Sequence, residues 1–248
     1  AKPEAVADPH TVLDTVDLKQ RVERDEYERR LPEALARLRT AGERLARRNG
    51  SAVIALEGWD AAGKGGAIRR LTAGLDAALY RVIPIAAPTQ EERAHHWLWR
   101  FWRHLPRAGH LTIFDRTWYG RVLVERIEGF CHEADWRRAY GEINDFEAQL
   151  RAHGIALVKL WLHLSPGEQL KRFREREKTA WKNYKITDED WRNRKQRPAY
   201  EAAAAEMVAR TSTPEAPWTL VAADCKLHAR LQILDAVAAA IEVSRPLP

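Results

Sequence analysis

The stretch VIALEGWDAAGKGG, residues Val53–Gly66, is the part of the chain around which we expect the other segments to be organised. Within it, Gly58, Gly63 and Lys64 fit the spacing G-x-x-x-x-G-K of a P-loop. Glycines at these positions allow successive backbone N–H groups to surround an anion, and the following helix N-terminus and the lysine add positive charge. The stretch predicts a phosphate-binding loop; a glycine-rich turn with an incidental lysine is the alternative.

The flanking segments have the strand and helix character that a P-loop requires. Ala52–Leu56 is an apolar, strand-like run, and Ala67–Leu71 is helix-forming. Gly65 occupies the position after the lysine, where a nucleotidase P-loop has Ser or Thr to bind Mg²⁺. Asp60 is therefore our candidate for the missing ligand, because Mg²⁺ prefers carboxylate oxygen. The other loop residues predicted to contact phosphate are Gly58, Ala61, Ala62, Gly63, Gly65 and Gly66.

Length and charge restrict the class of protein. The chain has 248 residues, which is enough for one large α/β domain with its own core. Its net charge of +6 and its pI of about 9.4 favour an anionic partner. Most of the positive charge comes from arginine, whose planar fork suits phosphate oxygens.

Cysteine usage and hydropathy argue against several other classes. Cys131 and Cys225 do not make a disulfide framework, and no C-x-x-C pair or histidine cluster indicates a metal cage. The chain shows neither a signal-peptide pattern nor an apolar run of the about 18 residues that a membrane span needs. We therefore expect a reducing, cytoplasmic location and no membrane partner.

Apolar runs alternate with helical patterns along the chain. This alternation, with a P-loop after the first run, predicts a parallel sheet covered by helices on both faces. The active groups should gather at the carboxyl ends of the strands, where Asp60, Lys64 and Asp115 fall. Besides the first run, the predicted strands are Tyr80–Ala86, Gly109–Asp115, Ile155–Leu164 and Pro217–Ala222.

Several helical segments carry more specific expectations. Residues 1–16 are expected to form an N-terminal arm, and residues 17–248 a single domain. Asp17–Arg48 is helical and charged, and Pro32 predicts a break into two helices. Its leucine stripe is expected to pack on the core, with an oligomer contact as the alternative. Thr89–Leu105 is predicted as one helix, and its tryptophans favour core packing over a platform for bases.

A strongly basic window follows the fourth predicted strand. Residues 171–197 hold eleven Lys or Arg and five acids, so their net charge equals the +6 of the whole chain. Trp181, Tyr184 and Trp191 are interleaved with these charges. The window predicts a lid, at about residues 171–205, that closes over an anionic chain; a solvated pair of basic helices is the alternative.

A second motif follows the third predicted strand, as Phe114–Arg121, FDRTWYGR. Asp115 at the strand tip can bind the same Mg²⁺ as the P-loop, while Arg116 and Arg121 can reach phosphate oxygens. A strand-end aspartate alone is weak evidence. Combined with the P-loop, it indicates phosphoryl-transfer chemistry.

Four segments carry a resemblance to a known family in their order and spacing. They are EGWDAAGKGGAIRRL (Glu57–Leu71), PTQEE…WLWRFWRHLP (Pro88–Pro106), IFDRTWYGRVLVERIEGF (Ile113–Phe130) and APWTLVAADCKLHAR (Ala216–Arg230). With these segments the sequence resembles polyphosphate kinase family 2 over about Asp17–Glu242. That resemblance implies a three-layer α/β/α P-loop kinase fold with a five-stranded parallel sheet and a helical lid. It also implies reversible phosphoryl transfer between inorganic polyphosphate and nucleotides, dependent on Mg²⁺ or alternatively Mn²⁺.

The resemblance also implies roles for individual residues. The two metal-binding aspartates of the family match Asp60 and Asp115, and its P-loop lysine matches Lys64. With Arg116 and Arg121, these residues form the predicted catalytic set. The remaining predicted phosphate- or nucleotide-binding side chains are Arg100, Arg172, Arg176, Lys182 and Lys185.

The amino-acid sequences of these motifs, together with KITDEDWRNR at Lys185–Arg194, are most similar to those of the AMP-phosphorylating subgroup. Two departures bear on that assignment. Members of the subgroup often carry two fused copies of this domain, whereas this sequence has one. Arg197 and Pro198 also stand where the subgroup is expected to have Trp and a non-proline residue.

The expected substrates are therefore inorganic polyphosphate and a nucleoside mono- or diphosphate, with AMP to ADP as the main reaction and ADP to ATP as a further one. A homo-oligomer, dimer or tetramer, is expected, and nucleic acid is not an expected partner. One alternative is an ATP-dependent nucleoside monophosphate kinase, for which the basic window is larger than needed. The other is a non-enzymic polyanion-binding module, which leaves Asp60 and Asp115 without a role.

Overall fold

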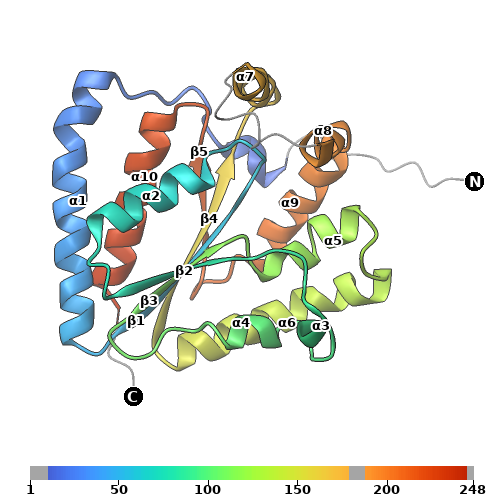
Figure 1. Cartoon of the computed structure of the whole chain (residues 1–248), viewed down its shortest axis with the longest axis horizontal. Helices are drawn as coiled ribbons and strands as arrows, with labels where there is room; N and C mark the ends of the chain where they lie inside the picture. The colour runs from blue at the N-terminus through green and yellow to red at the C-terminus, as the bar shows by residue number, and fades with distance from the viewer. Residues whose placement is uncertain (1–10, 179–187, 245–248) are drawn as a thin grey trace, which may run out of the picture.

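The structure, a computed structural model, describes residues 11–178 and 188–244. Its centre is one five-stranded sheet in the order β2-β3-β1-β4-β5, in which every neighbouring pair is parallel (Figure 1). The predicted α/β class and parallel sheet are confirmed. The strands are β1 Ser51–Gly58, β2 Tyr80–Pro84, β3 Leu111–Asp115, β4 Ile155–His163 and β5 Trp218–Ala222.

Helices cover both faces of this sheet, as Figure 1 shows. On one face lie α1 (Arg24–Arg47), α2 (Lys64–Gly74) and α10 (Lys226–Glu242). The other face is covered by α6 and α9 and by three short helices. Beyond the carboxyl end of β4 lie α7 and α8. The remaining helices are α3 Gln90–Arg93, α4 Trp99–Trp102, α5 Val124–Ile127, α6 Glu133–Ala152, α7 Pro166–Glu177, α8 Asp188–Lys195 and α9 Arg197–Thr211.

The central strand β1 places the functional loops beside one another. It pairs with β3, where Leu56 lies opposite Asp115, and with β4, where Gly58 lies opposite Leu162. All nine residues of β4 are buried, as expected for an apolar strand with helices on both faces. The P-loop and the segment after β3 therefore leave the sheet side by side.

Pro32 does not divide α1, so the predicted break is wrong. A proline inside a helix removes one backbone hydrogen bond and costs about 3 kcal/mol. The helix continues because its leucine stripe packs on the core, where Leu38 and Leu45 are at most 2% exposed. Burial of one leucine stabilises by about 1.5–3 kcal/mol, so this packing outweighs the lost bond.

Thr89–Leu105 is not one helix, which corrects the second helical prediction. It forms the single turns α3 and α4, separated at residues 94–98. The His96 Nδ1 atom accepts the backbone N–H of Leu98 at 3.3 Å, so a side chain replaces a helical acceptor. The prediction that the tryptophans of this segment pack in the core is only partly correct. Trp97 packs against the core, whereas Trp102 is 42% exposed.

The first described residues belong to the body of the molecule. Val12–Thr15 forms a 3-10 helix, η1, in which Leu13 is 1% exposed. Residues 1–10 of the predicted arm lie outside the described residues. Within the described ranges, every helix is too short or too polar to cross a lipid bilayer.

The edge strand β5 is closed by a side chain of α10. The backbone N–H of Ala222 donates to Gln232 Oε1 at 3.2 Å, and Gln232 Nε2 donates to the Leu220 carbonyl at 3.1 Å. The amide of Gln232 therefore occupies the position of a neighbouring strand. At the opposite edge, β2 carries Arg81 and Pro84.

Candidate active site

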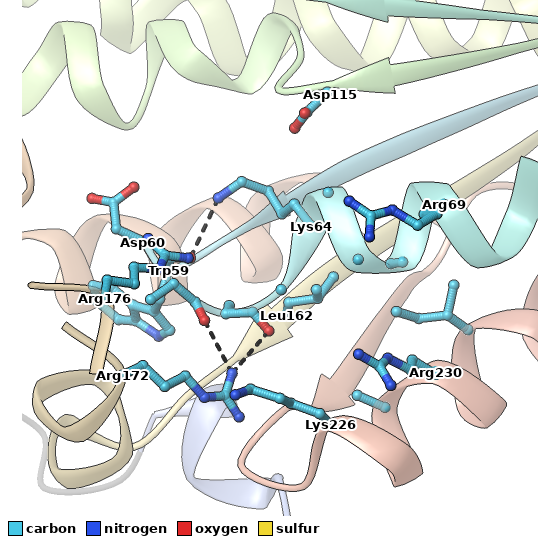
Figure 2. Close-up of a pocket in the computed structure, with 18 of the residues that line it drawn as sticks. Trp59, Asp60, Lys64, Arg69, Asp115, Leu162, Arg172, Arg176, Lys226 and Arg230 are labelled. Carbon is cyan, nitrogen blue, oxygen red and sulfur yellow. Dashed lines mark hydrogen bonds between the residues drawn. The ribbon is translucent and has the colours of Figure 1, made fainter. Parts of the chain in front are cut away.

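A cavity of about 710 Å³ opens at the carboxyl ends of the strands, between the P-loop and α7, α8 and α10 (Figure 2). It brings together residues that the sequence spreads over more than a hundred positions. The structure thus joins the P-loop, the end of β3 and described residues of the basic window in one site. The predicted site residues that line it are Asp60, Ala61, Ala62, Gly63, Lys64, Gly65, Gly66, Asp115, Arg116, Arg172 and Arg176.

The P-loop backbone explains where glycine is required. Gly58 has φ +146°, and a Cβ there would lie 2.6 Å from the carbonyl oxygen of Leu162, so a larger residue cannot fit. Gly63 has φ +112° and precedes the first turn of α2. No acidic residue stands in that turn, so its free N–H groups and its dipole favour an anion. This is the geometry expected of a phosphate cradle.

Lys64 crosses this loop. Its Nζ atom donates to the carbonyl oxygens of Gly58 at 2.7 Å and Trp59 at 3.3 Å. An ammonium carries three donors, so Lys64 can also reach an anion in the cavity. Figure 2 shows the side chains of Asp60, Lys64 and Asp115, which come from the P-loop, α2 and the end of β3.

Asp60 and Asp115 fit a magnesium ion bound jointly with substrate. Within the described ranges, no three His, Cys, Asp or Glu side chains form a group that could hold a metal by themselves. Mg²⁺ is commonly bound through one or two carboxylates, with water and substrate phosphate completing its shell. In the structure Asp60 Oδ2 accepts Asn193 Nδ2 of α8 at 3.0 Å, and Oδ1 lies 3.7 Å from Arg116 Nη2. Both carboxylates line the cavity in which phosphates would lie.

Glu57 fixes the segment after β3, a role the sequence interpretation missed. The backbone N–H and the hydroxyl of Thr117 both donate to Glu57 Oε1 at 2.8 Å. Burial raises the pKa of Glu57, and the charge of Lys64 opposes that rise. Arg116, the residue before Thr117, has φ +62°, a conformation that is rare for a residue with a side chain. An acid within an otherwise apolar run was the available sequence signal.

Arg172, predicted to bind phosphate, lines the cavity, but its side chain is occupied by protein acceptors. Its side chain is 3% exposed, and all five of its N–H donors have partners. Nη1 donates to the carbonyls of Ala61 and Ala62, and Nη2 to those of Ala223 and Asp224. Nε donates to a carboxylate of its own helix. Arg172 therefore binds two carbonyls of the P-loop, and all of its N–H donors are bonded to protein acceptors (Figure 2).

The other predicted basic residues divide into three cases. Arg176 lines the cavity. Arg100 instead donates to the carbonyl of Ala86 at 2.9 Å and does not line it. Arg121 is also outside it, paired with Glu125 at 2.9 Å and placed over the ring of Trp97. Lys182 and Lys185 lie outside the described residues.

Four further basic residues line the cavity, although they were not among the predicted site residues. Arg69 and Arg70 lie on α2 beyond the P-loop, and Lys226 and Arg230 lie on the first turns of α10. Their four-residue spacing places Lys226 and Arg230 on one helix face, so a sequence signal existed. Figure 2 shows Arg69 and Arg230 on the side of the cavity away from Asp60. We define these four residues, which line part of the cavity, as the basic groove.

A buried histidine, His163 at the end of β4, contacts the P-loop through Trp59. The indole N–H groups of Trp59 and Trp161 both donate to His163 Nδ1, at 3.2 and 3.3 Å. Burial, helped by the charge of Arg197, lowers the pKa of His163 to about 4. This histidine is therefore neutral near pH 7 and acts as an acceptor for both tryptophans.

This pKa predicts a pH-dependent stability. Because the folded pKa lies below the unfolded value of 6.5, the unfolded state binds the extra proton between pH 6.5 and about 4. Stability should be complete above pH 6.5 and should fall by about 3 kcal/mol as the pH drops through that window. Urea unfolding at several pH values measures it, with His163→Gln as the comparison. An equally steep loss in that variant would contradict the assignment.

Comparisons with known proteins agree with this geometry. The family description Polyphosphate kinase 2 (PPK2) matches residues 21–246. The chain is 55% identical over 237 residues to the polyphosphate:AMP phosphotransferase of Pseudomonas aeruginosa, covering 96% of this chain and 48% of that protein. It is 37% identical over 204 residues to the GDP-polyphosphate phosphotransferase of Mycobacterium tuberculosis, covering 81% and 69%.

Two crystal structures resemble the fold closely. One, of a polyphosphate kinase 2 from Pseudomonas aeruginosa, matches with a TM-score of 0.90 and 56% identity, covering 93% of this chain and 49% of that one. Another, of Polyphosphate Kinase 2 from Arthrobacter aurescens, matches with a TM-score of 0.88 and 31% identity, covering 95% and 86%. The chain spans about half the length of the polyphosphate:AMP phosphotransferases that it matches.

Proposed function

The chain belongs to the polyphosphate kinase 2 family, and we propose that it transfers phosphoryl groups reversibly between inorganic polyphosphate and a nucleotide, with AMP as the main acceptor. The observation that carries the proposal is the single cavity in which P-loop amides, Lys64 and two carboxylates meet a basic groove. The 55% identity to a polyphosphate:AMP phosphotransferase supports AMP as the acceptor.

In the proposed reaction an oxygen of the AMP phosphate attacks the terminal phosphorus of the polymer. The bond to the next bridging oxygen breaks, which gives ADP and a polymer one unit shorter. The acceptor oxygen is already ionised, so no general base is required. Phosphoryl transfer spreads charge over the migrating group, and the protein contributes mainly by positioning and by neutralising that charge.

The residues of the cavity divide this work. The P-loop amides and Lys64 would hold the phosphates being exchanged, and Arg116, which lines the same cavity, would contact the migrating group. A Mg²⁺ ion held by Asp60 and Asp115 would neutralise phosphate charge; Mn²⁺ is the alternative ion. Arg172 binds the carbonyls of Ala61 and Ala62 and so fixes the conformation of the loop that would surround the anion.

The basic groove suits the polymer rather than the nucleotide. Polyphosphate has one charge per unit along its length, so the four cationic side chains on α2 and α10 that line the cavity attract it cumulatively. A mononucleotide has few phosphates and is held by the P-loop. This difference favours polyphosphate over ATP as donor and sets the proposal apart from an ATP-dependent nucleoside monophosphate kinase.

A direct assay tests the function. The protein is incubated with Mg²⁺ and AMP, ADP, GMP or GDP, with long-chain polyphosphate or ATP as donor, and the products are separated. We expect ADP from AMP with polyphosphate to form fastest, and ATP from ADP more slowly. Turnover with ATP but not polyphosphate would favour the monophosphate kinase. Salt-sensitive binding without turnover would favour a polyanion-binding module.

Asp60→Asn tests the metal. The amide keeps the size of the side chain but loses its charge, so the Mg²⁺ concentration for half-maximal rate should rise at least about tenfold. The measurement is initial rate against Mg²⁺ concentration. Glu133→Gln, exposed on α6, is the matched control and should leave the titration unchanged. An unchanged titration in Asp60→Asn would assign the ligand role to another residue.

The basic groove makes a further prediction. In the double variant Arg69→Gln/Arg230→Gln, the KM for polyphosphate should rise about tenfold at low salt. By analogy with nucleic acids, the slope of log KM against log salt should decrease by about one for each charge removed. Nucleotide affinity by calorimetry should stay within about twofold, because the P-loop contacts are kept.

The control for the groove is Arg24→Gln on α1, where the side chain is 84% exposed and does not line the cavity. It should leave the KM for polyphosphate and its salt slope unchanged. Equal losses for polymer and nucleotide in the groove variant would contradict a polymer-specific role.

A further inference from the structure

A second polar cluster lies on the opposite face of β4 from the basic groove, between the sheet and α6. It centres on an ion pair in which Lys159 Nζ lies 2.7 Å from Glu147 Oε2. The two side chains are 0% and 3% exposed. Neither residue lines the cavity of the candidate active site. The proposed chemistry therefore does not account for this pair.

The cluster holds the segment that follows β3. Glu147 Oε1 accepts the indole N–H of Trp118 at 3.0 Å and the hydroxyl of Tyr119 at 2.5 Å. Lys159 also donates to the Tyr119 oxygen at 3.2 Å and to the carbonyl of Thr211. Burial, followed by the charge of Glu147, raises the pKa of Tyr119 well above its usual value, so the phenol remains a donor.

Stability alone is a poor explanation for such a pair. Removing two charges from water is costly, and apolar replacements of similar volume are often neutral or stabilising. The pair is found instead where two aromatic side chains need a common acceptor. Trp118 and Tyr119 are 0% exposed and begin the 3-10 helix η2, Trp118–Arg121.

These anchored aromatics are separated from the site by very little chain. Asp115 and Arg116 line the cavity, and Thr117 is held by Glu57. Arg116 has φ +62°, and a conformation of this kind persists only where the surrounding structure enforces it. The Glu57 contact lies just after Arg116, and the Glu147 contacts follow within the next two residues.

We propose that Glu147 is a positioning residue for the phosphoryl transfer, and this rests on the proposed function. Its Oε1 atom fixes Trp118 and Tyr119, and through them it holds Asp115 and Arg116 toward the phosphates. Lys159 holds the other carboxylate oxygen, so the acceptor keeps one orientation. Loss of the acceptor should lower kcat and leave polymer binding in the basic groove intact.

Two double variants separate the acceptor from the ion pair. Glu147→Gln/Lys159→Met removes both charges but keeps an oxygen for Trp118 and Tyr119. Glu147→Leu/Lys159→Met removes the charges and the acceptor, at nearly the same volume. Both lose the same lysine contacts, so they are matched. Urea unfolding at several temperatures identifies a temperature at which both variants are folded, and all assays are made at that temperature.

The glutamine variant should keep kcat within about threefold of wild type, whereas the leucine variant should lose at least about tenfold. The KM for polyphosphate should be unchanged in both, a separation that general destabilisation would not give. Hydrogen exchange provides a readout that does not depend on activity. Amides of residues 115–121 should exchange at least about tenfold faster in the leucine variant, while those of α1 should not change.

Equal loss of kcat in the two variants, or no loss in the leucine variant, would overturn the proposal. A rise in the KM for polyphosphate that matches the fall in kcat would do the same. If wild-type protein fails to turn over polyphosphate with any nucleotide, the proposed function fails instead. The exchange comparison then decides whether Glu147 holds the segment, and unchanged exchange at residues 115–121 overturns that role.

Discussion

Lys64→Ala is expected to lower kcat for polyphosphate-dependent phosphorylation of AMP about a thousandfold or more, with the fold intact. Lys64 lines the cavity and donates to two loop carbonyls, and no apolar contact of the core depends on its ammonium. Removing one preorganised donor from a phosphoryl or acyl transition state typically costs a factor of about 10²–10³, and a full charge costs more. The measurement is kcat under saturating polyphosphate, AMP and Mg²⁺.

The control is Lys171→Ala, on α7, where the side chain is 65% exposed. It removes the same charge outside the cavity and should keep wild-type turnover. Circular dichroism should be unchanged in both variants, and urea unfolding should show that both are folded under the assay conditions. If Lys64→Ala kept more than about a tenth of wild-type kcat, its loss would be below about 1.4 kcal/mol and its assigned role would be wrong.

Arg172→Lys is expected to lower kcat at least about a hundredfold and the free energy of unfolding by about 2–4 kcal/mol. Lysine keeps the charge but has three donors in place of five, so carbonyls of the P-loop or of residues 223–224 lose their partner in a buried site. Ala61 has φ +63°, so the loop conformation itself depends on being held. Urea unfolding and saturation kinetics measure the two effects.

Arg176→Gln separates this role from phosphate binding, because Arg176 lies one turn further along α7 and lines the cavity. Arg176→Gln should raise the KM for polyphosphate and decrease its salt slope, with stability unchanged. Arg172→Lys should leave the salt slope as in wild type. A decreased slope in Arg172→Lys, with normal stability, would return Arg172 to the phosphate-binding set.

Much of the fold was predictable because the sheet and the P-loop are encoded locally. Every predicted strand exists, and the bounds of Tyr80–Ala86 and Pro217–Ala222 differ from the observed strands by one or two residues. A buried parallel strand needs only a continuous apolar run, and a P-loop needs glycines at fixed spacing. The site then follows from topology, since parallel strands end on the same side of the sheet.

The predictions that were wrong depend on tertiary contacts and on side-chain orientation, which local sequence does not encode. Pro32 lies within α1 because packing of distant residues outweighs a local penalty. The interruption at His96 depends on how one ring turns toward its own backbone. Arg172 and Arg176 have the same charge, lie four residues apart and both line the cavity, yet Arg172 donates its guanidinium N–H groups to backbone carbonyls of the P-loop and of residues 223–224. A sequence does not distinguish these two environments.

The acids at positions 57 and 147 were missed for a related reason. Both lie among apolar neighbours, one in a strand and one on the buried face of a helix. A periodic pattern treats such a residue as an exception. In the structure both are acceptors for the segment after β3.

The Gln232 contact with β5 has a consequence for how copies of this protein meet. A free sheet edge is a template for pairing with another chain, and it promotes fibril formation when proteins are crowded or partly unfolded. Gln232 occupies the polar groups of β5 at Ala222 and Leu220, while β2 exposes the charge of Arg81 and lacks an N–H at Pro84. Edge-to-edge strand pairing between copies, the first step of such fibrillation, is therefore disfavoured at both borders of the sheet.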